Sequence, residues 1–88
     1  MNNVEFIATY IYKNPGARYM EIIAALLKWK YGSDIDMSTY RGWGSTYFSE
    51  SYLNKVRYKD VLWRKVDPDN RVSGYVLTLK GLGRVVVD

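Results

Sequence analysis

The 88 residues of this chain include neither cysteine nor histidine. The side chains that could bind a ligand therefore act by hydrogen bonding or by charge. A thiolate metal site is therefore excluded, and a zinc site would need carboxylate ligands throughout, which is unusual. A nucleophile would have to be activated by lysine or by a carboxylate. The segment Gly81-Leu82-Gly83 is too short for a phosphate-binding loop. We therefore expect no enzyme activity, no metal and no cofactor.

A group of hydrogen-bonding side chains falls on one predicted helix, from about Thr46 to Lys59 with Ser45 as its N-cap. The residues expected to face the core follow the i, i+3, i+4, i+7 spacing of a helix: Ser49, Tyr52, Leu53 and Val56. The residues expected to face solvent are Thr46, Tyr47, Glu50, Ser51, Asn54 and Lys55.

These side chains have the chemistry that reads base edges in a major groove. Asn54 could pair with adenine, Glu50 could accept from the N4 amine of cytosine, and Tyr47 could contact a thymine methyl group or a phosphate. Thr46 could meet base edges in the same way. The alternative interpretation is a solvated helix face without a ligand.

Basic residues before, on and after this helix are the candidate phosphate contacts: Arg41, Lys55, Arg57, Arg64 and Arg71. The last two flank Asp67-Pro68-Asp69-Asn70, whose composition predicts a tight turn. Asp67 and Asp69 would oppose phosphate by their charge. The alternative is therefore that the two aspartates shape the turn and that the arginines are ordinary surface residues.

Two further helices must support these groups. Val4, Ile7, Ala8 and Ile11 predict a first helix from about Asn3 to Lys13, capped by Asn2 or Asn3 and ended by Asn14-Pro15-Gly16. A second helix, from about Arg18 to Tyr31, is apolar almost all round, which is typical of a central helix. Gly32 suits its C-terminal end.

The C-terminal third predicts a β-hairpin after the third helix. Strands are expected at 61–66 and 72–79, with a turn at 67–70 and a bulge at Gly74. Residues 33–44 read as a long loop, in which Trp43 either anchors the loop on the core or contacts DNA or a partner. The expected core is Ile7, Ile11, Ile23, Leu27, Leu53, Val56, Leu62 and Leu77.

The order of three helices and a hairpin resembles the winged-helix variant of the helix-turn-helix fold. Leu53-Asn54-Lys55-Val56 followed by Asp60-Val61-Leu62 is similar to the family's recognition helix and first wing strand, with Asp60 where glycine is usual. Tyr75-Val76-Leu77-Thr78-Leu79-Lys80-Gly81 is similar to the end of its second wing strand. Pro15 to Ile22 resembles the start of its second helix, whereas the 33–44 loop replaces the family's tight turn.

This resemblance implies a single α+β domain over residues 1–88 that binds double-stranded DNA sequence-specifically and regulates transcription. The third helix would lie in the major groove and the wing on the backbone. The small size, the nine tyrosines and the lack of cysteine and histidine also resemble winged-helix proteins of archaeal viruses and plasmids. The alternative is a winged-helix adaptor that binds protein and not DNA.

Charge and hydropathy fit a nucleic-acid partner and no membrane. The net charge is +4 and the pI about 9.4, which is compatible with a polyanion. No signal peptide or transmembrane segment is evident, so we expect a cytoplasmic protein, in the host cytoplasm if viral. The thin core of so short a chain and the apolar tail Val85-Val86-Val87 predict a homodimer. Pairing of that tail within its own sheet is the alternative.

Overall fold

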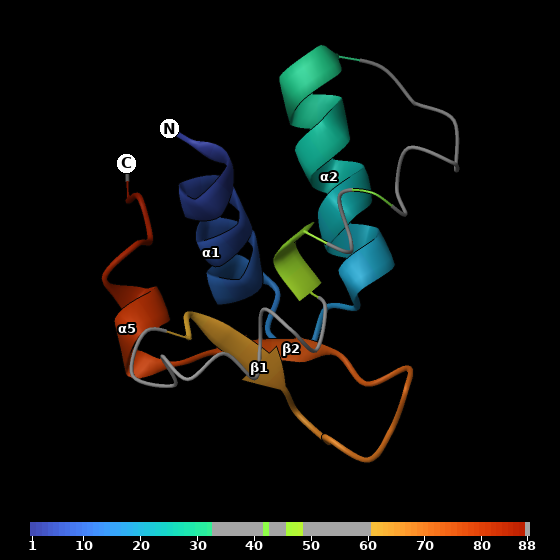
Figure 1. The fold of residues 1–88 in the computed structure, drawn as a ribbon. Coiled ribbons are helices and arrows are strands. Elements are labelled where there is room, and N and C mark those ends of the chain that lie inside the picture. Colours follow the sequence, from blue (N-terminus) through green and yellow to red (C-terminus); the bar gives the residue numbers. More distant parts are fainter. Residues whose placement is uncertain (33–41, 43–45, 49–60, 88) are drawn as a thin grey trace.

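The structure, a computed structural model, describes residues 1–32, 42, 46–48 and 61–87 of an α+β protein (Figure 1). Its elements are α1 (Asn3–Lys13), α2 (Tyr19–Tyr31), β1 (Trp63–Lys65), β2 (Tyr75–Leu77) and α5 (Leu79–Leu82). Residues 42 and 46–48 are also helical. The strands form a two-stranded antiparallel sheet, and α1 and α2 stand on the same side of it.

Local capping chemistry sets the bounds of α1 and α2. The Asn2 side chain accepts from the Glu5 N–H at 2.8 Å, and the Glu5 carboxylate accepts from the Asn2 N–H at 2.9 Å. This reciprocal pair satisfies two donors that a helix start leaves without partners. Gly32 ends α2 with φ 77°, a left-handed conformation that glycine adopts without a steric penalty. The predicted bounds of both helices are confirmed, with Arg18 as the N-cap of α2.

The predicted third helix is described only in part. Residues 46–48 are helical as expected, and Thr46 Oγ1 donates to the Gly42 carbonyl at 3.0 Å. Gly42 is itself helical, so the predicted 33–44 loop is wrong at that residue. The rest of that loop and residues 49–59 lie outside the described part of the chain.

The second strand ends earlier than its apolar pattern suggests. The register pairs Trp63 with Leu77 and Lys65 with Tyr75, and Thr78 then begins α5 by accepting from the Gly81 N–H at 3.1 Å. Leu79, predicted to close the strand, is instead the first residue of α5 and is 88% exposed. A threonine N-cap therefore overrides a β-branched and apolar run.

A close backbone contact explains Gly74. The Gly16 N–H donates to the Tyr75 carbonyl and the Tyr75 N–H to the Ala17 carbonyl, both at 2.9 Å, so the turn between α1 and α2 lies against β2. A Cβ on residue 74 would lie 1.8 Å from the Gly16 oxygen. The β1–β2 pairing continues regularly to a bond from the Val66 N–H to the Gly74 carbonyl. The predicted bulge is thus wrong: this glycine permits close approach of two backbones.

The core joins the two helices to the hairpin through aromatic residues. Its buried members are Ile7, Ile11, Ala17, Ile22, Ile23, Leu26, Leu27, Phe48, Trp63 and Tyr75. The predicted Ile7, Ile11, Ile23 and Leu27 are confirmed, whereas Leu62 and Leu77 are only partly buried at its edge. Leu53 and Val56 lie outside the described residues.

The aromatic centre of the core was not predicted. Trp63 is fully buried, and Phe48 stands 5.7 Å from its ring and 4.7 Å from that of Tyr75, between centroids. Such pairs stabilise a fold by about 0.5–1.5 kcal/mol beyond their buried area. Phe48 thereby ties the start of the third helix to both strands.

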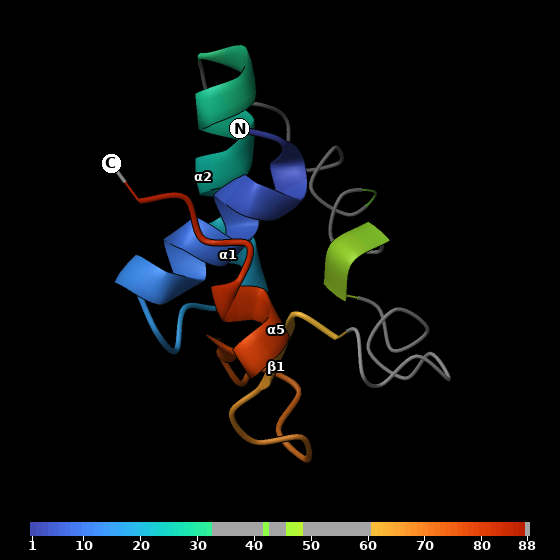
Figure 2. The same ribbon diagram turned by 90° about the vertical axis from the view of Figure 1, so that its left-hand side faces the viewer.

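The C-terminal tail runs beside α1 of its own chain (Figures 1 and 2). The Val86 N–H donates to Thr9 Oγ1 at 2.9 Å, which gives this buried hydroxyl a partner. Residues 85–87 have no strand conformation, so pairing of the tail within the sheet, the alternative raised above, is wrong for them. Val87 remains 81% exposed.

Candidate functional site

The hairpin loop between β1 and β2 extends away from α1 and α2 in both views (Figures 1 and 2). Its own polar side chains hold it. The Asp67 carboxylate accepts from the Asp69 N–H at 3.1 Å, and the Asn70 side chain accepts from the Val72 N–H at 3.0 Å. Ser73 Oγ accepts from the Asp67 N–H at 2.9 Å. Asp67 therefore has a structural role in the turn, as the alternative interpretation expected of the two aspartates.

Two predicted cationic residues belong to this hairpin, and both are exposed. Side chains alternate between the two faces of a strand, so burial of Trp63 turns Arg64 outward. Arg71 lies in the loop itself, and Lys65 is half-buried on the same face as Trp63. The hairpin thus presents guanidinium groups from a strand and from a loop, and a guanidinium suits bidentate recognition of phosphate.

The start of the third helix departs from the prediction at Tyr47. Thr46 is exposed as expected, but Tyr47 is half-buried and packs against the core. Its hydroxyl accepts from Asn3 Nδ2 at 3.2 Å, and its carbonyl accepts from Trp63 Nε1 at 3.0 Å. Tyr47 is therefore held toward α1 and β1, because its hydroxyl and its carbonyl bond residues there. The expectation that it faces solvent is wrong.

The remaining predicted contacts lie outside the described residues. They are Arg41, Glu50, Asn54, Lys55 and Arg57. The structure therefore places Arg64 and Arg71 in the hairpin and Thr46 and Tyr47 at the helix start.

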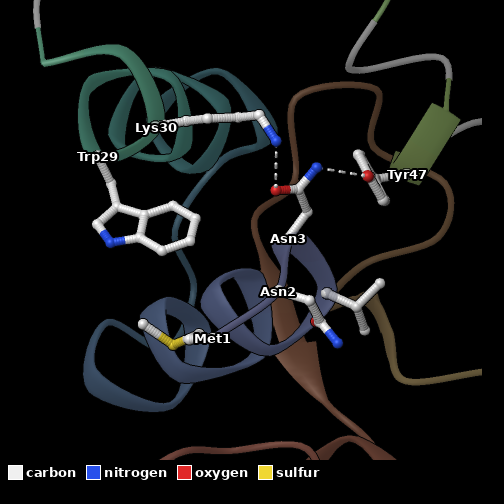
Figure 3. A pocket seen from close by; sticks show the side chains of 7 residues that line it. Met1, Asn2, Asn3, Trp29, Lys30 and Tyr47 are labelled. Carbon is white, nitrogen blue, oxygen red and sulfur yellow. Dashed lines mark hydrogen bonds between the residues drawn. The ribbon is translucent and has the colours of Figure 1, made fainter.

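A hollow that sequence analysis did not identify lies between the start of α1 and the end of α2 (Figure 3). It has a volume of about 660 Å³ and is lined by Met1, Asn2, Asn3, Val4, Trp29, Lys30 and Tyr47. Asn3 links its two sides, since it accepts from Lys30 Nζ at 3.4 Å and donates to the Tyr47 hydroxyl at 3.2 Å. The alternation Lys28-Trp29-Lys30-Tyr31 was the available sequence signal.

One tyrosine of the described residues has a shifted pKa. Burial, with a smaller contribution from Tyr19, raises the pKa of the Tyr75 hydroxyl above its usual value. Among the described residues no group of acidic side chains is placed to hold a metal ion. Within the same residues, no helix has the length and apolar character needed to cross a membrane.

Comparison with known proteins finds no matching family model, no matching curated protein and no matching solved structure.

Proposed function

We propose that this chain binds double-stranded DNA as a winged-helix regulator, with the third helix in the major groove and the hairpin on the backbone. The observation that carries the proposal is the projecting hairpin, which exposes Arg64 on β1 and Arg71 in a loop held by its own side-chain hydrogen bonds. Contacts from such groups to phosphate fix the orientation of a protein on the duplex.

The arrangement of the described elements supports the proposal further. The α1–α2 turn pairs with β2, and a hairpin follows two helices and a third helical segment, which is compatible with a winged helix. The net charge of +4 is compatible with a negatively charged partner such as nucleic acid. Sequence specificity would come from the third helix, through Thr46 and the predicted residues that follow it.

A specific observation favours the second candidate, a protein-binding adaptor. Val66 and Val72 flank the hairpin loop and are each 59% exposed. Apolar side chains at the tip of a projecting element suit a protein partner as well as a DNA groove. The salt dependence of binding separates the two functions.

The test is a titration of labelled duplex DNA at several salt concentrations. Log K should fall linearly with log salt, with a slope of about −0.9 for each phosphate neutralised. Arg71→Gln and Arg64→Gln should each reduce the slope by about one phosphate and weaken all duplexes alike. Arg84→Gln is the matched control, because Arg84 is exposed but lies after α5. Absence of duplex binding, or affinity independent of salt, would favour the adaptor.

We also propose that the DNA-binding form is a homodimer. The tail bonds Thr9 of its own α1 through Val86, yet Leu79 at the start of α5 and Val87 in the tail are 88% and 81% exposed. A second copy would cover these apolar side chains. A two-fold dimer would place two recognition helices about 34 Å apart, in successive major grooves. Sedimentation at micromolar concentration should show a dimer that Leu79→Ser weakens, and a monomer with an unchanged duplex affinity would contradict it.

A further inference from the structure

The hollow beside α1 and α2 combines an aromatic ring with a cation and amides. Figure 3 shows the Trp29 indole and the Lys30 side chain reaching from α2 toward Asn3, with Met1 opposite the indole. Its volume of about 660 Å³ is within the range of about 300–1,000 Å³ that is usual for small-ligand sites. Its polar groups come from two helices, so a ligand there would contact both.

The indole at this site is held in place from behind. The ring of Phe6 stacks on Trp29 with centroids 4.7 Å apart and an interplanar angle of 20°, and Tyr10 stacks on Phe6 at 6.5 Å. Phe6 thus covers one face of the indole, while Trp29 as a whole is 44% exposed. An aromatic ring fixed in this way is a stacking platform that loses little conformational entropy when a flat ligand binds.

Among the described residues, two lysines adjoin the platform. Lys28 and Lys30 flank Trp29 in the last turn of α2, and both are exposed. The only acidic residue of α1 is Glu5, whose carboxylate accepts the Asn2 N–H and does not line the hollow. Lysine ammonium groups attract phosphate, while an aromatic face stacks on any base.

We propose that this hollow binds an unpaired nucleotide of a single-stranded nucleic acid. The base stacks on the face of Trp29 opposite Phe6, the adjoining phosphates lie toward Lys28 and Lys30, and the Asn3 amide donates to or accepts from the base edge. The proposal does not rest on duplex binding, since Trp29 and Lys28 belong to α2 and not to the hairpin.

The experiment measures binding of a labelled oligothymidylate of about a dozen nucleotides by fluorescence anisotropy, together with quenching of tryptophan emission. Trp29→Ala should weaken binding about 5- to 150-fold, which corresponds to the 1–3 kcal/mol typical of one stacked base. Trp29→Phe should retain most of the affinity but lose the quenching. Lys28→Gln should weaken binding and reduce its salt dependence.

The matched control is Tyr12→Ala, because Tyr12 is an exposed aromatic residue of α1 that does not line the hollow. It should leave the affinity unchanged. Circular dichroism of each variant checks that α1 and α2 remain folded, and Trp29→Phe keeps the test valid if Trp29→Ala unfolds.

Three results would overturn the proposal. They are equal affinity of the Trp29→Ala and Tyr12→Ala variants, no binding of the oligonucleotide to the unmodified chain, and binding of free thymidine monophosphate but not of the strand. The last result would identify a free nucleotide as the ligand. Loss of strand binding in Trp29→Ala with unchanged duplex binding would separate this site from the hairpin.

Discussion

Gly74→Ala should destabilise the protein strongly, although it adds a single methyl group. The new Cβ would lie 1.8 Å from the Gly16 carbonyl oxygen and 2.4 Å from its carbonyl carbon. Both atoms belong to backbone, which cannot rotate away as a side chain can. The turn between α1 and α2 must therefore move off β2, and two hydrogen bonds joining Gly16 and Ala17 to Tyr75 would break.

The expected cost follows from these contacts. Overpacking of this kind costs about 1–3 kcal/mol. Two backbone hydrogen bonds contribute about 0.5–1.5 kcal/mol each, so the total is about 2–6 kcal/mol. A chain of 88 residues has a free energy of unfolding of about 4–13 kcal/mol. The substitution should thus remove a large part of that free energy and lower the melting temperature by about 8 °C or more.

The assay is urea denaturation followed by circular dichroism, with Gly83→Ala as the matched control. Gly83 has φ −68° and its Cβ would lie 3.4 Å from the Lys80 oxygen, so alanine fits there. The control should change the free energy of unfolding by less than about 1 kcal/mol. Equal urea midpoints for the Gly74→Ala and Gly83→Ala variants would refute the close approach of β2 and the α1–α2 turn.

Three further substitutions probe pH dependence, helix capping and the tail. Burial raises the pKa of Tyr75 above 10.0, so the folded chain keeps a proton that the unfolded chain releases. The contribution of the Tyr75 hydroxyl to the free energy of unfolding should be constant below pH 10. It should fall as the pH rises from there through the raised pKa. Tyr75→Phe should reduce that fall in denaturation series at increasing pH, and an unchanged slope would contradict it. Asn2→Ala should cost about 1 kcal/mol in the same assay by removing the cap of α1, and no loss would mean that the capping box is not formed. Thr9→Val should cost about 0.5–1.5 kcal/mol and accelerate hydrogen exchange of the Val86 amide, whereas unchanged protection would place the tail elsewhere.

Local signals in the sequence determined α1 and α2. The apolar spacing in α1, the Asn2–Glu5 capping pair and Gly32 all act within a few residues, so no tertiary contact is needed to recognise them. The hairpin was predictable for the same reason, because Asp67 and Asn70 form their turns within the loop. The two hairpin arginines of the candidate site follow from that prediction.

Tertiary structure decided what depends on residues far apart in the chain. Gly74 reads as a bulge until Gly16 is seen against it, and Trp63 becomes the centre of the core because Phe48 and Tyr75 pack on it. The hollow depends on Asn3 meeting Lys30 and Tyr47, which are 27 and 44 positions away. Periodicity reports which face of an element is apolar, but not which element covers that face. Only the packing of α1, α2 and the hairpin determines those partners.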